Sequence, residues 1–149
     1  MAENIISLTL LRSPKYPDLT ADMGHHTFTY ALLPHPGTLT SSDVIGQANA
    51  INQPPVAVKG RCRVESTVFC DNPQVQIDAV KVADDGNGLI VRLHDAYGSL
   101  QHFSLKTVLP IKKWYVCDLL EEAVLEGKSG EIANQILHPF EIRTYRLCF

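Results

Sequence analysis

The sequence has no apolar run long enough to cross a membrane, for which roughly 18 residues are needed. It has no excess of basic side chains either, since 13 Lys and Arg stand against 16 Asp and Glu and give a formal net charge of −3. The basic residues are scattered singly, so the stripe typical of nucleic-acid binding is missing. The amino terminus lacks the basic start and apolar stretch of a signal peptide. We expect a cytoplasmic chain whose partners include neither nucleic acid nor membrane.

Catalytic signatures are equally scarce. No Gly-x-Ser-x-Gly elbow marks a nucleophilic serine, and the glycines at residues 86–88 are not followed by the Gly-Lys-Ser/Thr of a phosphate-binding loop. Glycosidases need two carboxyl groups on either side of a sugar, and no acidic pair is marked out here. We therefore expect that the chain does not carry a complete active site of its own.

None of the four cysteines belongs to a Cys-x-x-Cys pair. A chain of 149 residues is large enough to fold without disulfides, so we interpret the cysteines as free, mostly buried thiols. They are Cys62, Cys70, Cys117 and Cys148. A zinc site needs clustered ligands, and the nearest set, Cys62 and Cys70 with His25 and His26, is widely separated in the sequence.

His25 and His26 also lie close to Asp22 and Asp18, and imidazole with carboxylate would suit zinc or a similar ion. Neighbouring residues on a strand point to opposite faces, however, so two adjacent histidines cannot easily share one ion. We favour a loop end over a metal site and predict no metal ligand in this chain.

The first part of the chain predicts two strands and one helix. Residues 5–12 and 27–33 alternate with a period of two, so we expect two strands that pair with each other across a loop at residues 13–24. A Thr-Ser-Ser-Asp cluster then precedes apolar residues at helical spacing, which predicts a short helix from about residue 44 to 51. A boundary is expected near residues 53–63, where two prolines interrupt the pattern.

The rest of the chain contains six strand-like runs at regular spacing, which is typical of an immunoglobulin-like antiparallel β-sandwich. The runs cover residues 63–69, 75–83, 88–96, 100–109, 114–120 and 140–149. The turns at residues 84–88 and 97–99 predict hairpins between the second and third and between the third and fourth runs. Arg92, Arg143 and Arg146 are expected to be solvated on strand faces.

Arg12 continues the apolar face of residues 6–10 into a proline-bearing loop. Its guanidinium can therefore face a cleft, or it can form a structural salt bridge with Asp18, Asp22 or Glu141. From the residues alone, the salt bridge is the favoured interpretation.

Several strings resemble the carboxyl-terminal region of α-mannosidases of glycoside hydrolase family 38. Residues 8–18 (LTLLRSPKYPD) and 22–35 (DMGHHTFTYALLPH) match the family in order, and Asn-Gln-Pro at residues 52–54 follows them. Residues 77–92 resemble the hairpin of the family's last sandwich, and residues 139–147 resemble its closing strand. The resemblance runs almost end to end.

This resemblance implies an all-β region of a retaining, exo-acting α-mannosidase. Residues 1–60 would be the terminal strands of a β supersandwich with a short helix, and residues 61–149 the carboxyl-terminal β-sandwich. The family's aspartate nucleophile and its ligands for zinc or another divalent metal belong to an amino-terminal α/β domain and helical bundle, which residues 1–149 do not include. The chain alone should therefore be inactive, with no cofactor of its own.

The resemblance also implies partners and one site residue. The amino-terminal catalytic domain is the expected partner, and mannosides would be bound through it. Arg12 is the match for an arginine that can reach the substrate cleft in this family. Unpaired strand edges in residues 5–33 additionally predict a homo-oligomer.

The alternative is a free-standing β-sandwich that binds carbohydrate or protein. Sugar-binding faces usually present coplanar exposed aromatics, whereas Trp114 and Tyr115 would point to opposite faces of one strand. We therefore rank the binding module second.

Overall fold

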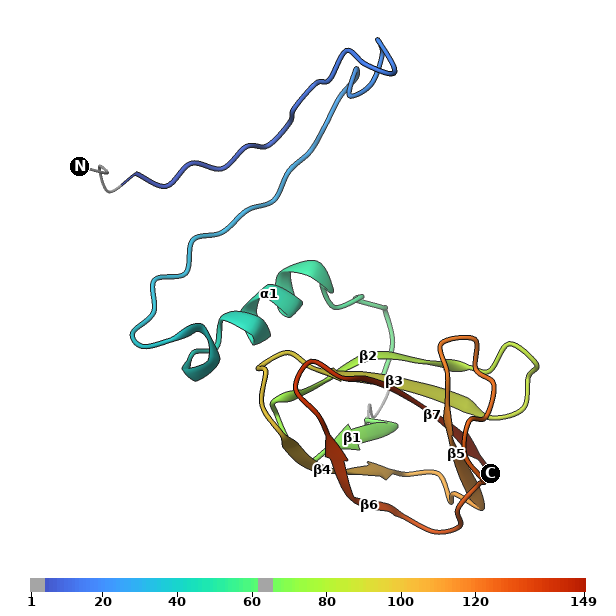
Figure 1. The fold of residues 1–149 in the computed structure, drawn as a ribbon. Helices are drawn as coiled ribbons and strands as arrows, with labels where there is room; N and C mark the ends of the chain where they lie inside the picture. Colours follow the sequence, from blue (N-terminus) through green and yellow to red (C-terminus); the bar gives the residue numbers. More distant parts are fainter. Residues whose placement is uncertain (1–4, 62–65) are drawn as a thin grey trace. The chain divides into compact units, whose positions relative to one another are not determined.

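The computed structural model of the protein describes residues 5–61 and 66–149, and the chain divides into two compact units, Met1–Gly37 and Thr38–Phe149. Among the described residues the first unit has no helix or strand, whereas the second has two short helices and seven strands (Figure 1). These elements are η1 (Leu39–Ser41), α1 (Val44–Asn52), β1 (Val68–Cys70), β2 (Val75–Val82), β3 (Leu89–Asp95), β4 (Gln101–Thr107), β5 (Lys113–Cys117), β6 (Ile132–Leu137) and β7 (Ile142–Cys148).

Two antiparallel sheets face each other in the second unit (Figure 1). One has the strand order β1–β4–β6 and the other the order β2–β3–β7–β5. Every neighbouring pair of strands runs antiparallel. The predicted antiparallel β-sandwich is confirmed, and so is the short helix before it, α1.

The core lies between the sheets and comes from one face of each strand. Val91 and Leu93 of β3 and Tyr145 of β7 are 0% exposed. The Tyr145 ring meets Phe103 at 6.4 Å and Trp114 at 5.7 Å between centroids, both edge to face, which aromatic pairs prefer. Burial of each large apolar side chain contributes roughly 1.5–3 kcal/mol to folding.

The hairpin predicted at residues 84–88 is present and joins β2 to β3. The Ala83 N–H donates to the Gly88 carbonyl at 2.9 Å, which closes the turn. Gly88 has a φ of 102°, and a Cβ there would lie 2.3 Å from the Leu147 carbonyl oxygen. Only glycine allows β3 to approach β7 so closely at this point.

The second predicted hairpin is wrong, because β3 and β4 belong to different sheets. Asp95, at the end of β3, is 1% exposed, and its carboxylate accepts hydrogen bonds from the backbone N–H groups of Tyr97, Gly98 and Ser99. These bonds fix a turn that carries the chain from one sheet to the other, where a hairpin would have continued the ladder.

The alternation does not predict β6. Ile132 and Leu137 are both fully buried although they are five residues apart, which a regular strand would not allow. Asn134 has a φ of 51°, and the register with β4 shifts between Phe103 and Leu105. The irregularity turns both apolar ends of β6 into the core and conceals its period.

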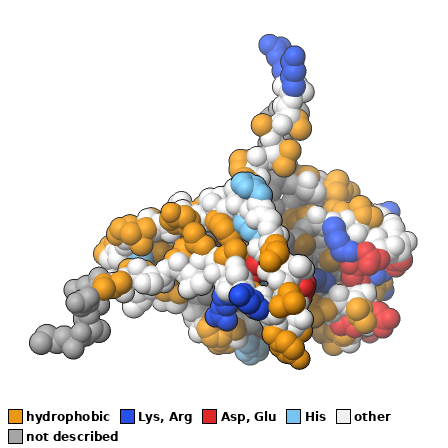
Figure 2. Space-filling view, turned by 90° about the horizontal axis from the view of Figure 1, so that it is seen from above, with side chains coloured by type: hydrophobic (Ala, Val, Ile, Leu, Met, Phe, Trp, Pro, Cys, Tyr) orange, Lys and Arg blue, Asp and Glu red, His pale blue; other side chains and the backbone are white. Residues whose placement is uncertain are grey.

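The segments at residues 5–12 and 27–33 are extended and meet at the loop of residues 13–24 (Figure 1). The predicted pairing between them is wrong, because among the described residues neither segment has a ladder neighbour. Ile6 is 87% exposed, Tyr30 71% and Leu32 78%. Figure 2 shows such hydrophobic side chains (orange) along the extended chain at its left. An isolated two-stranded ribbon buries too little apolar surface to be stable, which explains why the two segments stay unpaired.

The compact units divide the chain between Gly37 and Thr38. The boundary predicted near residues 53–63, between an amino-terminal arm and a second unit, stays a prediction. The start of the first predicted sandwich strand, residues 63–65, lies outside the described residues.

Candidate functional site

Arg12 lies exposed in the first unit, directly before the loop of residues 13–24. Two of the partners predicted for its guanidinium, Asp18 and Asp22, belong to the same unit and bind other groups. Asp18 accepts hydrogen bonds from the N–H and hydroxyl of Thr20, both at 2.8 Å, and Asp22 accepts the Ser13 N–H. Glu141 pairs with Arg143 inside the sandwich. Within the first unit, Asp18 and Asp22 therefore do not form the predicted salt bridge with Arg12. A pairing with Glu141 of the second unit and the role of Arg12 toward a substrate both stay predictions.

His26 lies directly after the same loop. Its Nε2 lies 2.9 Å from the Asp22 carbonyl oxygen, and its ring stacks on Phe28 with 6.0 Å between centroids. Among the residues that the structure describes, no three His, Cys, Asp or Glu side chains are close enough to hold a metal ion. Cys62, one ligand of the weighed zinc set, lies outside the described residues. His26 therefore serves the local structure of the loop.

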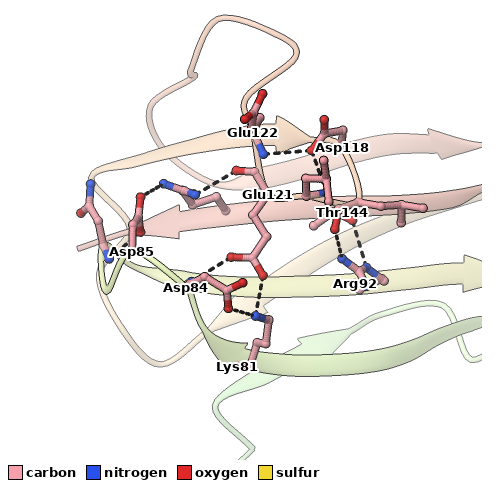
Figure 3. Close-up of polar contacts among 12 residues, drawn as sticks. Lys81, Asp84, Asp85, Arg92, Asp118, Glu121, Glu122 and Thr144 are labelled. Carbon is pink, nitrogen blue, oxygen red and sulfur yellow. Dashed lines mark hydrogen bonds and ion pairs between the residues drawn. The ribbon is translucent and has the colours of Figure 1, made fainter.

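A network of charged side chains lies on the outer face of the four-stranded sheet (Figure 3). Its centre is Glu121, which is 5% exposed and has a φ of 71°. One carboxylate oxygen pairs with Lys81 Nζ at 2.5 Å, and the other accepts the Asp84 N–H at 2.9 Å. Glu121 thus ties the loop after β5 to the end of β2 and the turn that follows it.

Two arginines hold the same loop from the sheet below. Arg146 donates to the Glu121 carbonyl at 2.8 Å and to Asp85 at 2.7 Å. Arg92 donates to the Leu119 carbonyl at 3.1 Å and to the Thr144 hydroxyl at 3.2 Å (Figure 3). Figure 2 shows acidic side chains (red) gathered close to Lys and Arg side chains (blue) on the sandwich.

The prediction that Arg92, Arg143 and Arg146 are solvated is therefore wrong. The Arg146 side chain is 18% exposed, and that of Arg143, which pairs with Glu141, is 19% exposed. Arg146 donates to a carboxylate and a carbonyl, and Arg143 donates to the Glu141 carboxylate. For Arg92 and Arg146, the strand pattern alone cannot show that a loop will cover the outer face of the sheet. Arg143 is paired with Leu93 and lies on the face that the core occupies.

The charges in this network suit a structural role better than acid–base catalysis. Lys81 and the Asp84 N–H hold the pKa of Glu121 below its ordinary value. The Asn87 N–H and then Arg146 do the same for the pKa of Asp85. A glycosidase acid needs a raised pKa to donate a proton, and both of these pKa values are shifted in the opposite direction. These two carboxylates line a hollow of about 500 Å³ together with Arg146.

Asp95 is the second buried carboxylate that the sequence did not single out. Burial alone would raise its pKa, but hydrogen bonds from the N–H groups of Phe140 and Tyr97 and from Gln101 outweigh that effect and lower the pKa. The Phe140 N–H donates at 2.9 Å and ties the turn after β3 to the start of β7. The sequence could have signalled only the bond to Tyr97, because an aspartate often accepts the backbone N–H two residues further on.

The thiols are free as predicted wherever the structure describes them: Cys117 is buried, and Cys70 and Cys148 are half-buried. Burial raises the pKa of Cys117 and of Cys70, so neither is activated as a nucleophile. No helix among the described residues is long and apolar enough to span a membrane.

Comparison with known proteins adds the following findings. Residues 74–145 match the family model for the glycosyl hydrolases family 38 C-terminal beta sandwich domain. Alpha-mannosidase G of Dictyostelium discoideum is 36% identical over 95% of the chain, and Alpha-mannosidase 2C1 of Homo sapiens is 39% identical over 93%. The Alpha-mannosidase of Saccharomyces cerevisiae is 30% identical over 98% of the chain. The chain spans only 14% to 16% of the length of these relatives. No solved structure gives a significant match.

Proposed function

Because the chain belongs to glycoside hydrolase family 38 as the carboxyl-terminal β region of its α-mannosidases, we propose that it has no chemistry of its own and supports the catalytic domain of a retaining α-mannosidase. The full-length enzyme would hydrolyse terminal α-mannosidic bonds. The amino-terminal catalytic domain would be the partner of this region, and mannosides would be bound through that domain.

One observation carries this proposal. The extended segments at residues 5–12 and 27–33 keep a strand-like alternation and expose large apolar side chains, Ile6 and Leu32 among them. Exposed apolar segments with free backbone groups are ready to add to a neighbouring sheet. A sheet of the larger enzyme would supply the ladder that the described residues do not.

The proposal assigns the divalent metal, zinc in most members, to the catalytic domain. The described side chains do not fit a metal centre, since no three potential ligands converge and His26 Nε2 is already bound to the Asp22 carbonyl oxygen. No step of the reaction is therefore derived through a metal in this region.

We assign Arg12 to contact with the mannoside. A guanidinium offers five N–H donors, which suits the several hydroxyl groups of a sugar. Arg12 is exposed at the base of a loop, and the two carboxylates of that loop, Asp18 and Asp22, bind Thr20 and Ser13.

The proposal also places the protein in the cytoplasm, since the three described cysteines are free thiols, as is usual in a reducing compartment. In isolation, the exposed apolar segments should drive association into a homo-oligomer. The alternative function, a free-standing sugar-binding module, has less support because Trp114 is 4% exposed and belongs to the core.

A chimera tests the supporting role. Residues 1–149 replace the matching region of the Saccharomyces cerevisiae enzyme, and hydrolysis of an aryl α-mannoside is compared with that of a version lacking the region. We expect the chimera to recover activity and the 149-residue chain alone, with zinc added, to show none. Turnover by the chain alone, or a chimera as inactive as the deletion, would overturn the proposal.

The same chimera tests Arg12. Arg12→Ala should raise KM about tenfold, the loss expected for a hydrogen bond from a charged donor. An unchanged KM would remove Arg12 from the binding site and leave the supporting role intact.

A further inference from the structure

The loop that follows Arg12 is closed at its base by one residue. The Ser13 N–H donates to the Asp22 carboxylate at 3.1 Å, across nine residues. The Asp22 carbonyl oxygen lies 2.9 Å from His26 Nε2, so the same residue also fixes the far side of the loop. Asp22 is thus bound on both sides, through its side chain and through its backbone.

The backbone at both ends of this closure is in the left-handed region. Ser13 has a φ of 47° and Asp22 a φ of 61°. Residues other than glycine adopt this region at a cost, and they keep it where surrounding contacts hold them there. Among the described residues, Asp22 supplies such contacts through its bonds to the Ser13 N–H and to His26 Nε2.

We propose that Asp22 is the positioning residue of the Arg12 loop, and that its bond to Ser13 sets the direction in which the chain presents Arg12. Arg12 directly precedes Ser13, so a fixed Ser13 N–H fixes the peptide that follows the Arg12 Cα. The inference rests on the proposed function in one respect: the presented guanidinium has a consequence for catalysis only where Arg12 meets the mannoside.

Two substitutions separate the bond from the backbone conformation. Asp22→Gly tolerates a positive φ but has no acceptor for Ser13, whereas Asp22→Asn tolerates the same φ and keeps an oxygen in place. Asp18→Ala is the matched control, since it removes a carboxylate of the same loop that bonds to Thr20 and not to Ser13.

The first measurement is amide exchange at Ser13 in the 149-residue chain. Asp22→Gly should speed exchange about tenfold, whereas Asp22→Asn and Asp18→Ala should leave it near the wild-type rate. If Asp22→Gly leaves the exchange rate at Ser13 unchanged, Asp22 does not hold the loop and the inference is wrong.

The second measurement is KM of the chimera. Asp22→Gly should raise KM about threefold to tenfold with little change in kcat, and Asp22→Asn should restore it. If Arg12→Ala raises KM and Asp22→Gly does not, the inference fails while the proposed function stands. If Arg12→Ala has no effect on KM, the proposed role of Arg12 fails, and so does the effect of Asp22 on KM. The exchange rates at Ser13 then decide whether Asp22 closes the loop.

Discussion

Residues 27–33 and β3 both alternate apolar and polar side chains over part of their length, but only β3 is a strand. β3 has β2 on one side and β7 on the other, and Val91 and Leu93 are 0% exposed between the sheets. Residues 27–33 have no ladder neighbour among the described residues, and Leu32 is 78% exposed. Alternation therefore records which face a segment can bury, whereas a partner sheet decides whether it is buried.

The test with the largest expected effect truncates one leucine side chain in each of the two regions. Leu93→Ala should lower the free energy of unfolding by about 3 kcal/mol, because it leaves a cavity in the core. Leu32→Ala should change it by less than about 0.5 kcal/mol, since the side chain is already exposed. Urea unfolding of the chain, followed by circular dichroism, measures both. Equal losses for the two variants would mean that residues 27–33 are buried in solution.

A smaller effect is expected at the turn that crosses between the sheets. Asp95→Ala leaves the N–H groups of Gly98 and Phe140 without their acceptor and should cost about 2 kcal/mol. Asp78→Ala is the matched control, because Asp78 pairs with His94 while 38% exposed, and such pairs contribute at most about 1 kcal/mol. The same urea titration compares them, and a larger loss for Asp78→Ala would contradict this ranking.

The smallest effect concerns the loop over the outer face, and it depends on pH. The folded protein lowers the pKa of Glu121, so the ionised carboxylate contributes stability above its ordinary pKa of 4.5, and this contribution is lost as the pH falls through the lower folded value. Glu121→Gln should lower the urea midpoint at neutral pH, and the difference from wild type should shrink below that ordinary pKa. Glu122→Gln, at the exposed neighbour, should show no such convergence.

The sequence predicted the secondary-structure elements that local patterns determine. The Asp-Asp-Gly-Asn-Gly turn predicted the β2–β3 hairpin because glycine supplies the positive φ that the turn needs. The polar cluster before Val44 predicted the start of α1, although the Asp43 side chain makes no capping hydrogen bond there. Both signals lie within a few residues of the element that they define.

What the sequence did not predict depends on contacts between distant residues. Glu121 bonds to the Asp84 N–H across 37 residues, and Asp95 to the Phe140 N–H across 45. Neither separation leaves a pattern in one sequence. The strand β6 was missed because the positive φ of Asn134 interrupts its alternation. The role proposed for Arg12 lies beyond both kinds of signal, since it would depend on a partner domain.

Trp114 is the single tryptophan of the chain, and it packs against Tyr145 in the core of the sandwich. Its indole emission should therefore shift to longer wavelength only when the sandwich opens and water reaches the ring. Residues 1–37 contain no tryptophan, so their docking or release does not add a second emitter. The chain thus carries an intrinsic, label-free fluorescent reporter of one of its two units.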